Sequence, residues 1–332
     1  MKKAAVLGAG FSGLASAWFL LQNPEIEVTL FDPVPIGKGT SGIAAGLMHP
    51  YAGSGSTLAY QGWEGWNATC NLLAVAAESL GEPVANFCSL LKPALTQEQQ
   101  EQFFLATQEN SALEWWDSAR CAAALPEAAP FPALFEPTAA VVDCARYLQG
   151  MWEACRRKGA QLIPVAIKGL DSLTDYEYVI VALGAFSKEL AVLNHPRITP
   201  VKGQVLEVEW PRTNSPLPFP LISEAYLVMN EATASCLIGG TYERRFTSEE
   251  PDPKSAWEWL GPKATAIFPS LKDAKIIGCK AGVRATTPNR RPFIGQIAPR
   301  CWSITGMGSK GLLYHALYAR QLVALLESKK FL

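Results

Sequence analysis

The chain opens with a long apolar run that contains few polar positions. Between residues 4 and 21 the run is interrupted only by two serines and three glycines. An apolar stretch that follows two lysines at the N-terminus is typical of a cleavable secretion signal. The same pattern also fits a buried strand at 4–7, a glycine-rich turn and a helix at 14–22. Hydrophobicity alone therefore leaves two interpretations of this segment.

The spacing of the three glycines separates these interpretations. In a dinucleotide-binding turn, Gly8 permits the tight turn, Gly10 lets the backbone approach a pyrophosphate and Gly13 lets the helix lie close to the sheet. A second apolar strand, 28–31, ends in Asp32, about twenty residues after the turn, where a carboxylate can hold ribose hydroxyls. A secretion signal has no use for that carboxylate. The N-terminus is therefore predicted to bind a nucleotide.

The stretch after Asp32 departs from a nicotinamide-binding domain, which would continue with another helix and strand. It is a run of small residues, 37–50, which lets the backbone pass flush against a large planar ligand. Helical patterns follow at 57–80 and 97–121, and the proline-rich segment 126–137 indicates a connection. We therefore expect a ligand-facing loop before the first long helix.

The middle of the chain combines a helix, two strands and a further glycine turn. Asp143 is predicted to cap a helix, 144–158, whose last turn is basic and which is followed by Gly159. Strands are predicted at 161–167 and 178–182, and the second leads into the glycine turn. A second part of the nucleotide-binding domain is expected here.

Between residues 201 and 277 the pattern changes to short apolar segments. Breaks that contain proline and serine separate segments such as 204–209, 225–228 and 236–241. Short strands with such breaks predict an antiparallel sheet.

The C-terminal block returns to a strand, a glycine-rich loop and a helix. The strand is predicted at 301–305 and the loop spans 306–311. One apolar stripe of the helix, at spacings of four and three, consists of Leu312, Ala316, Ala319, Val323 and Leu326. Nucleotide-binding features thus lie at both ends and in the middle of the chain, so one domain is predicted to be discontinuous.

These patterns predict an α/β fold: a discontinuous Rossmann-type domain with an inserted α+β substrate domain built on an antiparallel sheet. The length of 332 residues suits two domains. The cofactor-binding domain is assigned residues 1–82, 139–202 and 278–332, and the substrate domain is assigned residues 83–138 and 203–277.

The composition limits the partners. Twenty-nine basic and thirty acidic side chains leave a net charge of −1, which gives no global attraction to nucleic acid or to an anionic membrane, without excluding a local basic patch. No apolar run beyond the first is long enough to cross a bilayer. Eight cysteines without a C-x-x-C pair and three widely spaced histidines argue against a redox dithiol and a metal site. Reduced thiols in the cytoplasm are the expected state.

Several short motifs occur in an order that resembles one flavoprotein family. They are Ser41 with Ala44-Ala45-Gly46, Val181 to Ser187, Pro200 to Gln204, Gly239-Gly240-Thr241, Gly282-Val283-Arg284, Pro292 to Gly295 and the terminal glycine loop. Over nearly its whole length, the chain resembles FAD-dependent amine oxidoreductases such as D-amino-acid oxidase, glycine oxidase and sarcosine oxidase. The resemblance implies FAD as cofactor and oxidation of a C–N bond beside a carboxylate, by hydride transfer from the α-carbon to the flavin.

The resemblance and the glycine spacing together indicate the cofactor contacts. The residues expected to bind FAD are Gly8, Gly10, Phe11, Ser12, Gly13, Asp32, Ser41, Ala45, Gly46, Leu47, Val165, Gly184, Gly308, Ser309, Lys310 and Gly311. By the resemblance, Val165 stands where the family's backbone meets the adenine, although a buried strand valine would look the same. Relatives that attach FAD covalently use a histidine or a cysteine at positions that here hold Ile43 and Gly282. Non-covalent FAD is therefore expected, with nearby Cys279 keeping the question open.

Within the family, the loop 306–311 is most similar to that of the oxidase half of the bifunctional enzyme that modifies the wobble uridine of tRNA. The methyltransferase half of that enzyme is not part of this sequence, and Lys310 stands where its loop usually has arginine. Glycine-like amines and carboxymethylaminomethyl-uridine present the same N-carboxymethyl group. Both substrate classes therefore stay open.

Arg284 and Lys310 are the strongest candidates for catalytic roles. A guanidinium can hold a carboxylate through two parallel hydrogen bonds, as the resemblance implies for Arg284, and the alternative is a structural ion pair. The loop that contains Lys310 opens a helix, whose N-terminal amides favour negative charge on a reduced flavin. Lys310 either adds a full charge there or is a solvated surface lysine.

Further polar side chains have a functional and a structural interpretation each. His49 faces the substrate or is a satisfied buried histidine, and Tyr226 closes the pocket or only packs. Lys202 helps oxygen to react or stabilises a turn. The pairs Arg244-Arg245 and Arg290-Arg291 bind a polyanion or are solvated.

Three functions follow. The first is an FAD-dependent oxidoreductase of a glycine-like or N-substituted amino acid, with oxygen as the expected electron acceptor. The second is a stand-alone oxidase of carboxymethylaminomethyl-uridine in tRNA. The third is a flavin-binding interaction module without catalysis. The sequence indicates no oligomeric state.

Overall fold

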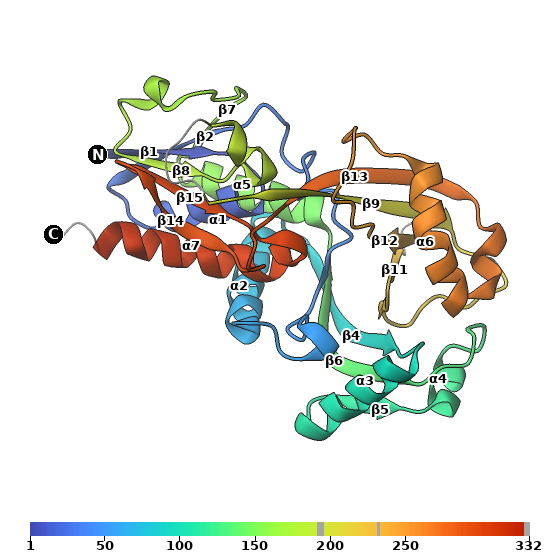
Figure 1. The fold of residues 1–332 in the computed structure, drawn as a ribbon. Helices are drawn as coiled ribbons and strands as arrows, with labels where there is room; N and C mark the ends of the chain where they lie inside the picture. Colours follow the sequence, from blue (N-terminus) through green and yellow to red (C-terminus); the bar gives the residue numbers. More distant parts are fainter. Residues whose placement is uncertain (191–195, 231–232, 329–332) are drawn as a thin grey trace.

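The computed structural model describes residues 1–190, 196–230 and 233–328, and its strands form two sheets (Figure 1). In this part of the chain the first sheet has six strands, in the order β14-β15-β8-β1-β2-β7. They are β1 (Lys2–Leu7), β2 (Ile26–Phe31), β7 (Gln161–Ile163), β8 (Tyr178–Val181), β14 (Phe293–Ala298) and β15 (Cys301–Thr305). Helices connect strands of the first sheet and pack beside it, as the predicted α/β class requires.

The first sheet begins with the predicted strand, turn, helix and strand. β1 and β2 are parallel, with Val6 opposite Leu30, and α1 (Phe11–Leu20) connects them. β8 pairs in parallel with β1, and β7 pairs in parallel with β2. Because parallel strands end at the same edge of a sheet, the glycine turn after β1, Asp32 after β2 and the glycine turn after β8 lie together.

Four helices pack against one another beside the first sheet (Figure 1). Besides α1 they are α2 (Gly62–Leu80), α5 (Cys144–Arg157) and α7 (Gly311–Ser328). Small residues let them approach closely: a Cβ added at Gly65 would lie 2.3 Å from the Leu313 carbonyl oxygen, and one at Gly150 would lie 2.6 Å from that of Ala76. The helical layer thus depends on glycines inside helices, where backbone approaches backbone.

The predicted helix caps and the predicted stripe are present. The Asp143 carboxylate accepts a hydrogen bond of 3.0 Å from the Arg146 N–H, and α5 is followed by Gly159 with φ +92°. The buried residues of α7 include the whole stripe of Leu312, Ala316, Ala319, Val323 and Leu326. These local patterns are confirmed because each is determined by neighbours in the sequence.

A larger sheet forms the other half of the molecule, in the order β13-β9-β12-β11-β10-β4-β6-β3, with β5 added on β6. Its strands are β3 (Leu47–Met48), β4 (Ala85–Pro93), β5 (Glu114–Trp116), β6 (Ala133–Val142), β9 (Thr199–Glu209), β10 (Leu221–Ile222), β11 (Tyr226–Asn230), β12 (Ser235–Gly239) and β13 (Ile276–Thr286). The pairing is antiparallel, as predicted, except between β10 and β4.

A helix that the sequence analysis missed covers this sheet. α6 (Pro253–Ile267) lies within the segment for which only strands were predicted, and its Leu260 and Ala264 are fully buried in the core of the second sheet. Asp252 caps it by accepting from the Ser255 N–H at 3.2 Å, and Pro253 occupies the first helical position. The Asp-Pro pair is a helix-start signal, although the sequence analysis assigned no helix to it.

The single helix predicted at 97–121 is wrong, because three elements occupy that segment. They are α3 (Gln97–Glu109), β5 and α4 (Ser118–Ala124). The chain leaves the helix at Asn110, whose backbone is extended. Trp116 then stacks on Phe135 with ring centroids 4.5 Å apart, and Asp117 caps α4. Tertiary packing of the tryptophan here overrides the helical pattern.

Three further boundaries differ from prediction. α2 begins at Gly62 rather than at residue 57. The segment 126–137 is a connection only in its first part, since β6 starts at Ala133 and holds Pro137 where its pairing with β4 is irregular. β7 ends at Ile163 rather than at residue 167, because the Val165 N–H turns back to donate to the Ile163 carbonyl.

The predicted domain boundaries at 138/139, 202/203 and 277/278 each fall within a strand, namely β6, β9 and β13. Figure 1 shows β9 and β13 running from the neighbourhood of the first sheet out to α6. Short 3₁₀ turns complete the structure at Ser54–Ser56, Leu170–Leu173, Gly184–Glu189, Pro269–Asp273 and Gly308–Lys310. In the described ranges no helix combines the length and the apolar character that crossing a membrane requires.

Candidate active site

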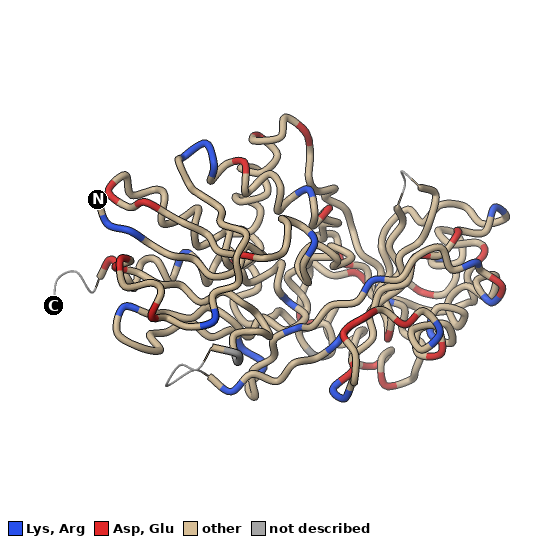
Figure 2. The backbone as a smooth tube through the Cα atoms, turned by 90° about the horizontal axis from the view of Figure 1, so that it is seen from above, with Lys and Arg blue, Asp and Glu red and all other residues tan. Residues whose placement is uncertain are grey.

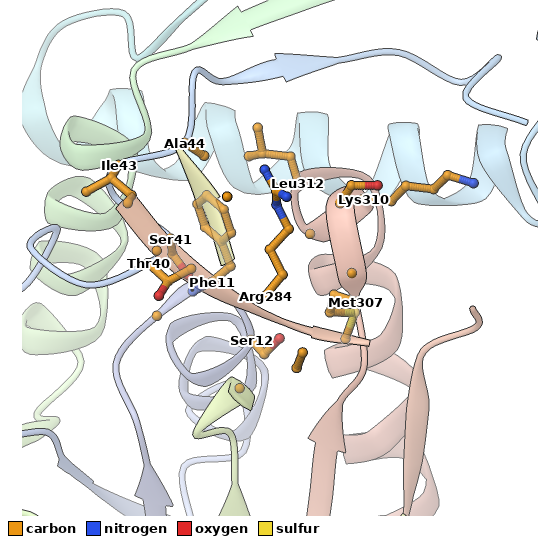
Figure 3. A pocket seen from close by; sticks show the side chains of 18 of the residues that line it. Phe11, Ser12, Thr40, Ser41, Ile43, Ala44, Arg284, Met307, Lys310 and Leu312 are labelled. Atoms are coloured by element: carbon orange, nitrogen blue, oxygen red, sulfur yellow. Dashed lines mark hydrogen bonds between the residues drawn. The ribbon is translucent and has the colours of Figure 1, made fainter. Parts of the chain in front are cut away.

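A large pocket of about 1080 Å³ lies where the two sheets meet. Its lining includes residues 7–12, 31–35, 39–49, 182–186, 282–285 and 304–313. Figure 3 shows Arg284 of β13 and Lys310 at the start of α7 in the same pocket as Phe11 and Ser41. The pocket is as large as the upper range of small-molecule sites. It therefore has room for an extended ligand with one end at the glycine turn and the other at Arg284.

The turn after β1 can exist only with glycines. Gly8 has φ +96°, and a Cβ on it would lie 2.6 Å from the Ala182 carbonyl oxygen. A Cβ on Gly13 would lie 1.8 Å from the Gly8 carbonyl oxygen, and one on Gly10 would lie 2.8 Å from Ser41 Oγ. Ser41 Oγ in turn accepts a hydrogen bond of 3.3 Å from the Phe11 N–H. The turn is thus a tightly packed backbone cradle that leaves no room for side chains at Gly8 and Gly13.

The Asp32 carboxylate is fixed beside this cradle. Its Oδ2 accepts from the Ala9 N–H at 2.7 Å, and its Oδ1 accepts from the Val34 N–H at 2.8 Å. Each oxygen keeps a further lone pair, and Asp32 lines the pocket. The carboxylate is therefore oriented to accept hydrogen bonds from hydroxyl groups of a ligand.

The run of small residues folds tightly on itself at the pocket wall. A Cβ on Gly42 would lie 1.9 Å from the Gly37 carbonyl oxygen. Gly46 has φ +81°, and a Cβ on it would lie 1.9 Å from the Val142 carbonyl oxygen. Ala45 is buried beside it and Leu47 also lines the pocket. This wall is mainly backbone and methyl groups, which suits a flat ligand.

The glycine loop before α7 forms another wall. Gly306 and Gly308 have φ of +78° and +57°, and the loop runs through a 3₁₀ turn directly into α7. Lys310 is half-buried at its end, and burial, assisted by the charge of Arg290, lowers the pKa of its ammonium. The lysine that could have been a solvated surface residue thus lines the pocket.

Arg284 is a largely buried cation that the chain leaves available. Its Nη1 donates to the Thr241 carbonyl at 2.9 Å, and no described carboxylate forms an ion pair with it. Burial lowers the pKa of Arg284, but a guanidinium stays charged at neutral pH. Because a buried charge without a partner is costly, this geometry favours an anionic ligand over a structural ion pair.

Three glycines make room for Arg284 and its neighbour Tyr226. A Cβ on Gly203 would lie 2.2 Å from Arg284 Nη2, and one on Gly240 would lie 2.9 Å from it. A Cβ on Gly239 would lie 2.3 Å from the Tyr226 hydroxyl oxygen. Burial raises the pKa of Tyr226, so its hydroxyl is a hydrogen-bond donor. The glycines of the motifs at 200–204 and 239–241 therefore leave room for the side chains of Arg284 and Tyr226.

Ser223 adds an unsatisfied polar atom to the same wall. Its hydroxyl oxygen is buried and has no hydrogen-bond partner among the described residues, and Ser223 lines the pocket. Buried hydroxyl groups are normally paired, so this one is available to a polar ligand atom.

Opposite charges and a histidine form a buried cluster at the pocket wall near β3. Glu136 Oε2 lies 3.0 Å from Lys92 Nζ and 3.0 Å from His49 Nδ1, and Lys92 also donates to the Tyr51 carbonyl at 2.8 Å. Glu136 is fully buried, and Lys92 and His49 are nearly so. Burial lowers the pKa of His49 and the pKa of Lys92. Burial raises the pKa of Glu136, but hydrogen bonds and charge from His49 and Lys92 outweigh burial, so the pKa of Glu136 is lowered overall. The cluster thus holds a carboxylate, an ammonium and a neutral imidazole.

Residues 3–325 match the family described as DAO, FAD dependent oxidoreductase. The chain belongs to this FAD-dependent oxidoreductase family. A protein of Maricaulis maris named tRNA 5-methylaminomethyl-2-thiouridine biosynthesis bifunctional protein MnmC is 26% identical over 96% of this chain and 51% of its own. The protein of the same name from Delftia acidovorans is 27% identical over 99% of this chain and 58% of its own. The chain thus spans about half the length of these relatives.

Solved structures of two oxidases share the fold. Glycine oxidase from Geobacillus kaustophilus has a TM-score of 0.85 at 20% identity, covering 99% of this chain and 95% of its own. Iminodiacetate oxidase from Chelativorans sp. BNC1 has a TM-score of 0.77 at 18% identity, covering 98% of this chain and 95% of its own. The predicted fold class and family resemblance are confirmed.

FAD is the cofactor that the family implies, and the pocket fits it. The glycine cradle of 8–12 offers backbone N–H groups for a pyrophosphate, and Asp32 offers a carboxylate for ribose hydroxyls. The flat wall of residues 42–47 and the amides at the start of α7 would hold the isoalloxazine ring. FAD supplies a two-electron acceptor when it is bound.

Ile43 and Gly282, the positions at which the resemblance would place a covalent attachment, both line the pocket and carry no nucleophilic side chain. A Cβ on Gly282 would lie 2.7 Å from Ile43 Cδ1, so the two residues contact each other directly. Cys279 lies outside the described lining of the large pocket, with its Sγ 3.9 Å from Gln204 Oε1. Burial raises the pKa of the Cys279 thiol, which disfavours the reactive thiolate.

Two expected cofactor contacts lie outside the described lining. Gly13 instead contacts the Gly8 carbonyl, which is the helix-to-turn packing that the glycine spacing predicted. Val165 is neither on a strand nor buried, since β7 ends at Ile163 and 48% of Val165 is exposed. Its neighbours 166–168 line the pocket, so its proposed backbone contact with adenine stays a prediction. The other expected residues, including Ser12, Gly184, Ser309 and Gly311, line the pocket.

Other candidate cations have structural partners. Lys202 is buried outside the described lining and donates to the Glu250 carbonyl at 2.6 Å, which favours its role in stabilising a turn. Arg291 lies 4.4 Å above the ring of Tyr60. His195 lies outside the described residues, and in the described part of the chain no group of three or more His, Cys, Asp or Glu side chains is placed to hold a metal ion.

Sequence reasoning missed the partners of His49. Lys92 and Glu136 were not singled out, although each is an isolated charge within an apolar strand, at 90–93 and 133–142. A charge at an inward position of a strand must be paired, which is the signal that could have identified them.

His315 was also missed. Its Nε2 lies 2.7 Å from the Tyr147 hydroxyl, and its Nδ1 lies 3.0 Å from the carbonyl oxygens of Gly311 and Leu312. Burial lowers the pKa of His315 to about 4, so the neutral ring donates from Nδ1 and accepts from Tyr147. This pair braces the start of α7.

Proposed function

We propose that this chain oxidises the C–N bond of a glycine-like or N-substituted amino acid, with non-covalently bound FAD as the cofactor. The observation that carries the proposal is Arg284, a largely buried guanidinium that lines the pocket with one carbonyl partner and no ion-pair counter-charge among the described residues, although Glu243 acts on it from further away. A substrate carboxylate would supply that charge through two parallel hydrogen bonds. The Tyr226 and Ser223 hydroxyls lie on the same wall and offer further hydrogen bonds.

The chain's own residues would orient the substrate in three ways. Arg284 would bind the carboxylate and so restrict where the adjacent α-carbon lies in the pocket. Lys310 and the amides at the start of α7 favour negative charge in that part of the pocket. Tyr226 lies beside Arg284 and would offer its hydroxyl to the bound carboxylate. Oxygen is the electron acceptor that we propose for the turnover.

Oxidation of carboxymethylaminomethyl-uridine in tRNA is the second candidate. It is supported by the alignment of nearly the whole of this chain with about half of each of two MnmC proteins, whose names state a role in tRNA modification. Against it, Figure 2 shows basic and acidic residues interspersed along the backbone of both halves, and the net charge is −1. A small free amine needs no basic surface, so we place it first.

Anaerobic mixing tests the proposal. Purified protein with FAD is mixed with glycine, sarcosine, iminodiacetate and tRNA that carries the modified uridine, and the flavin absorbance is followed. Bleaching by a small amine supports the first candidate, and bleaching by tRNA alone, weakened by salt, supports the second. No bleaching by any of them supports the third function, a flavin-binding interaction module.

A cytoplasmic location is part of the proposal. All eight cysteines are free thiols in the structure, which fits a reducing compartment. The oligomeric state is not part of the proposal.

A further inference from the structure

The buried cluster of His49, Glu136 and Lys92 determines which ring nitrogen of His49 carries a proton. Glu136 receives the Lys92 ammonium and the imidazole Nδ1, each at 3.0 Å from the same oxygen, Oε2. A carboxylate that lies against an ammonium is ionised and only accepts hydrogen bonds. His49 Nδ1 must then carry the proton that it shares with Glu136. Its other nitrogen, Nε2, is left as a hydrogen-bond acceptor.

Charge around the ring keeps it in this form. The charged groups that face His49 are Glu136 on β6, Lys92 on β4 and Lys310 at the start of α7. Burial lowers the pKa of His49, both lysines lower it further, and Glu136 opposes them. The imidazole is therefore neutral at neutral pH, with its tautomer determined by Glu136.

Arg284 and His49 have opposite hydrogen-bonding character on the same pocket. Arg284 only donates and suits a carboxylate, whereas His49 Nε2 only accepts and suits an N–H group. An α-amino acid presents one of each. Its amine is an ammonium in water, which must lose a proton before its nitrogen lone pair can assist cleavage of the neighbouring C–H bond.

We infer that His49 Nε2 accepts a proton from the substrate ammonium, and that Glu136 and Lys92 are positioning residues that set the His49 tautomer for this step. The substrate N–H bond breaks, its electron pair stays on nitrogen and a new Nε2–H bond forms. Glu136 stabilises the resulting imidazolium. This inference rests on the proposed amine substrate and names the residues that prepare it.

The first test is a tautomer measurement that needs no catalysis. Protein with ¹⁵N-labelled histidine is examined by NMR from pH 6 to 9, and His49→Gln identifies the signals of residue 49. We expect the wild-type ring to be protonated on Nδ1 and unprotonated on Nε2 at pH 7 and above. Glu136→Gln should mix the tautomers, whereas Glu209→Gln, in the exposed ion pair with Lys275, should change nothing. A ring that is protonated on Nε2 or doubly protonated at pH 7 overturns the inference.

The second test is the pH dependence of flavin reduction by sarcosine without oxygen. In His49→Gln, the amide oxygen can still accept a hydrogen bond but cannot take a proton. We expect reduction at pH 7 to slow by about 100-fold and to recover about tenfold per pH unit as the free amine forms. An unchanged pH profile overturns the inference.

The two failures can be told apart. If no amine bleaches the wild-type flavin, the proposed function fails. If sarcosine bleaches wild type and His49→Gln with the same pH profile, only the inference fails.

Discussion

The two ends of the pocket are built in different ways. At the nucleotide end, residues 8–13 and Asp32 form a cradle of backbone groups within one strand, turn, helix and strand. At the substrate end, the pair of Arg284 and Tyr226 and the cluster of His49, Lys92 and Glu136 come from five strands or their ends, and each group forms only in the folded sheet. The structure of the nucleotide end depends on close backbone packing that only glycine permits, and that of the substrate end depends on the pairing of buried charges. Substitutions should therefore fail for different reasons at the two ends.

The strongest test of the nucleotide end is Gly13→Ala. The new Cβ would lie 1.8 Å from the Gly8 carbonyl oxygen, so helix and turn must separate. We expect loss of FAD binding and about 3 kcal/mol of stability, measured by FAD titration and urea unfolding. Gly169→Ala is the control, since nothing lies within 4 Å of a Cβ there. Retained FAD affinity in Gly13→Ala would contradict the steric account.

At the substrate end, Glu136→Gln should destabilise through charge. It leaves the buried Lys92 without its counter-charge, at a cost of about 3–5 kcal/mol. The double variant Lys92→Met with Glu136→Gln should be more stable than Glu136→Gln alone, because no buried ammonium remains. Urea unfolding measures both, with Glu209→Gln and Lys275→Met as the exposed pair for comparison. Strict additivity of the two buried substitutions would show that they do not interact.

The His315–Tyr147 pair, which braces the start of α7, predicts a dependence of stability on pH. The pKa of His315 is about 4 in the folded state against 6.5 for a free histidine. As pH falls, the unfolded chain binds the proton first, so stability that is complete above pH 6.5 is lost as the pH falls to 4. The difference corresponds to about 3 kcal/mol. Unfolding of wild type and His315→Gln in urea at pH 7.5 and 5 should give a smaller loss for the variant; equal losses would contradict the role of His315.

Arg284→Ala separates substrate binding from cofactor binding. With the clamp removed, kcat/KM for the amine should fall by about 100-fold while FAD affinity stays unchanged. Arg284→Lys should recover only part of the loss, since an ammonium lacks the paired donors. Exposed Arg245→Ala is the control. Loss of FAD in Arg284→Ala would instead make this arginine part of the cradle.

The smallest expected effect concerns the bond between protein and FAD. Cys279→Ser should release FAD on acid precipitation as completely as wild type, because Cys279 lies outside the described pocket lining. Flavin absorbance of the supernatant measures the release. Flavin that stays with wild-type protein but leaves the variant would indicate a covalent thioether.

The same contrast explains what could be predicted from the sequence. Gly8, Gly10, Gly13 and Asp32 were identifiable because one short segment contains the whole turn and its spacing is fixed by geometry. Arg284 was identifiable through the motif around it. Lys92 and Glu136 were not, because they lie 44 positions apart and acquire meaning only through pairing of β4 with β6.

The predicted secondary structure was wrong mainly where tertiary contacts determine the backbone conformation. Trp116 extends the backbone inside a helical pattern because it stacks on Phe135. α6 was missed because its Asp252-Pro253 start resembles a loop. Val165 was placed on a strand that ends two residues earlier.

The continuity of β9 and β13 has a consequence for how this scaffold can acquire new specificity. The inner end of β13 carries Arg284, and its outer part pairs with β9 beside the core that holds α6. Dividing the chain within β9 or β13 would break the pairing between these two strands and expose unpaired strand edges. The outer part of the sheet is therefore not a domain that could be exchanged as a unit. We expect new substrate specificity to arise instead from single substitutions of residues on the pocket-facing sides of intact strands.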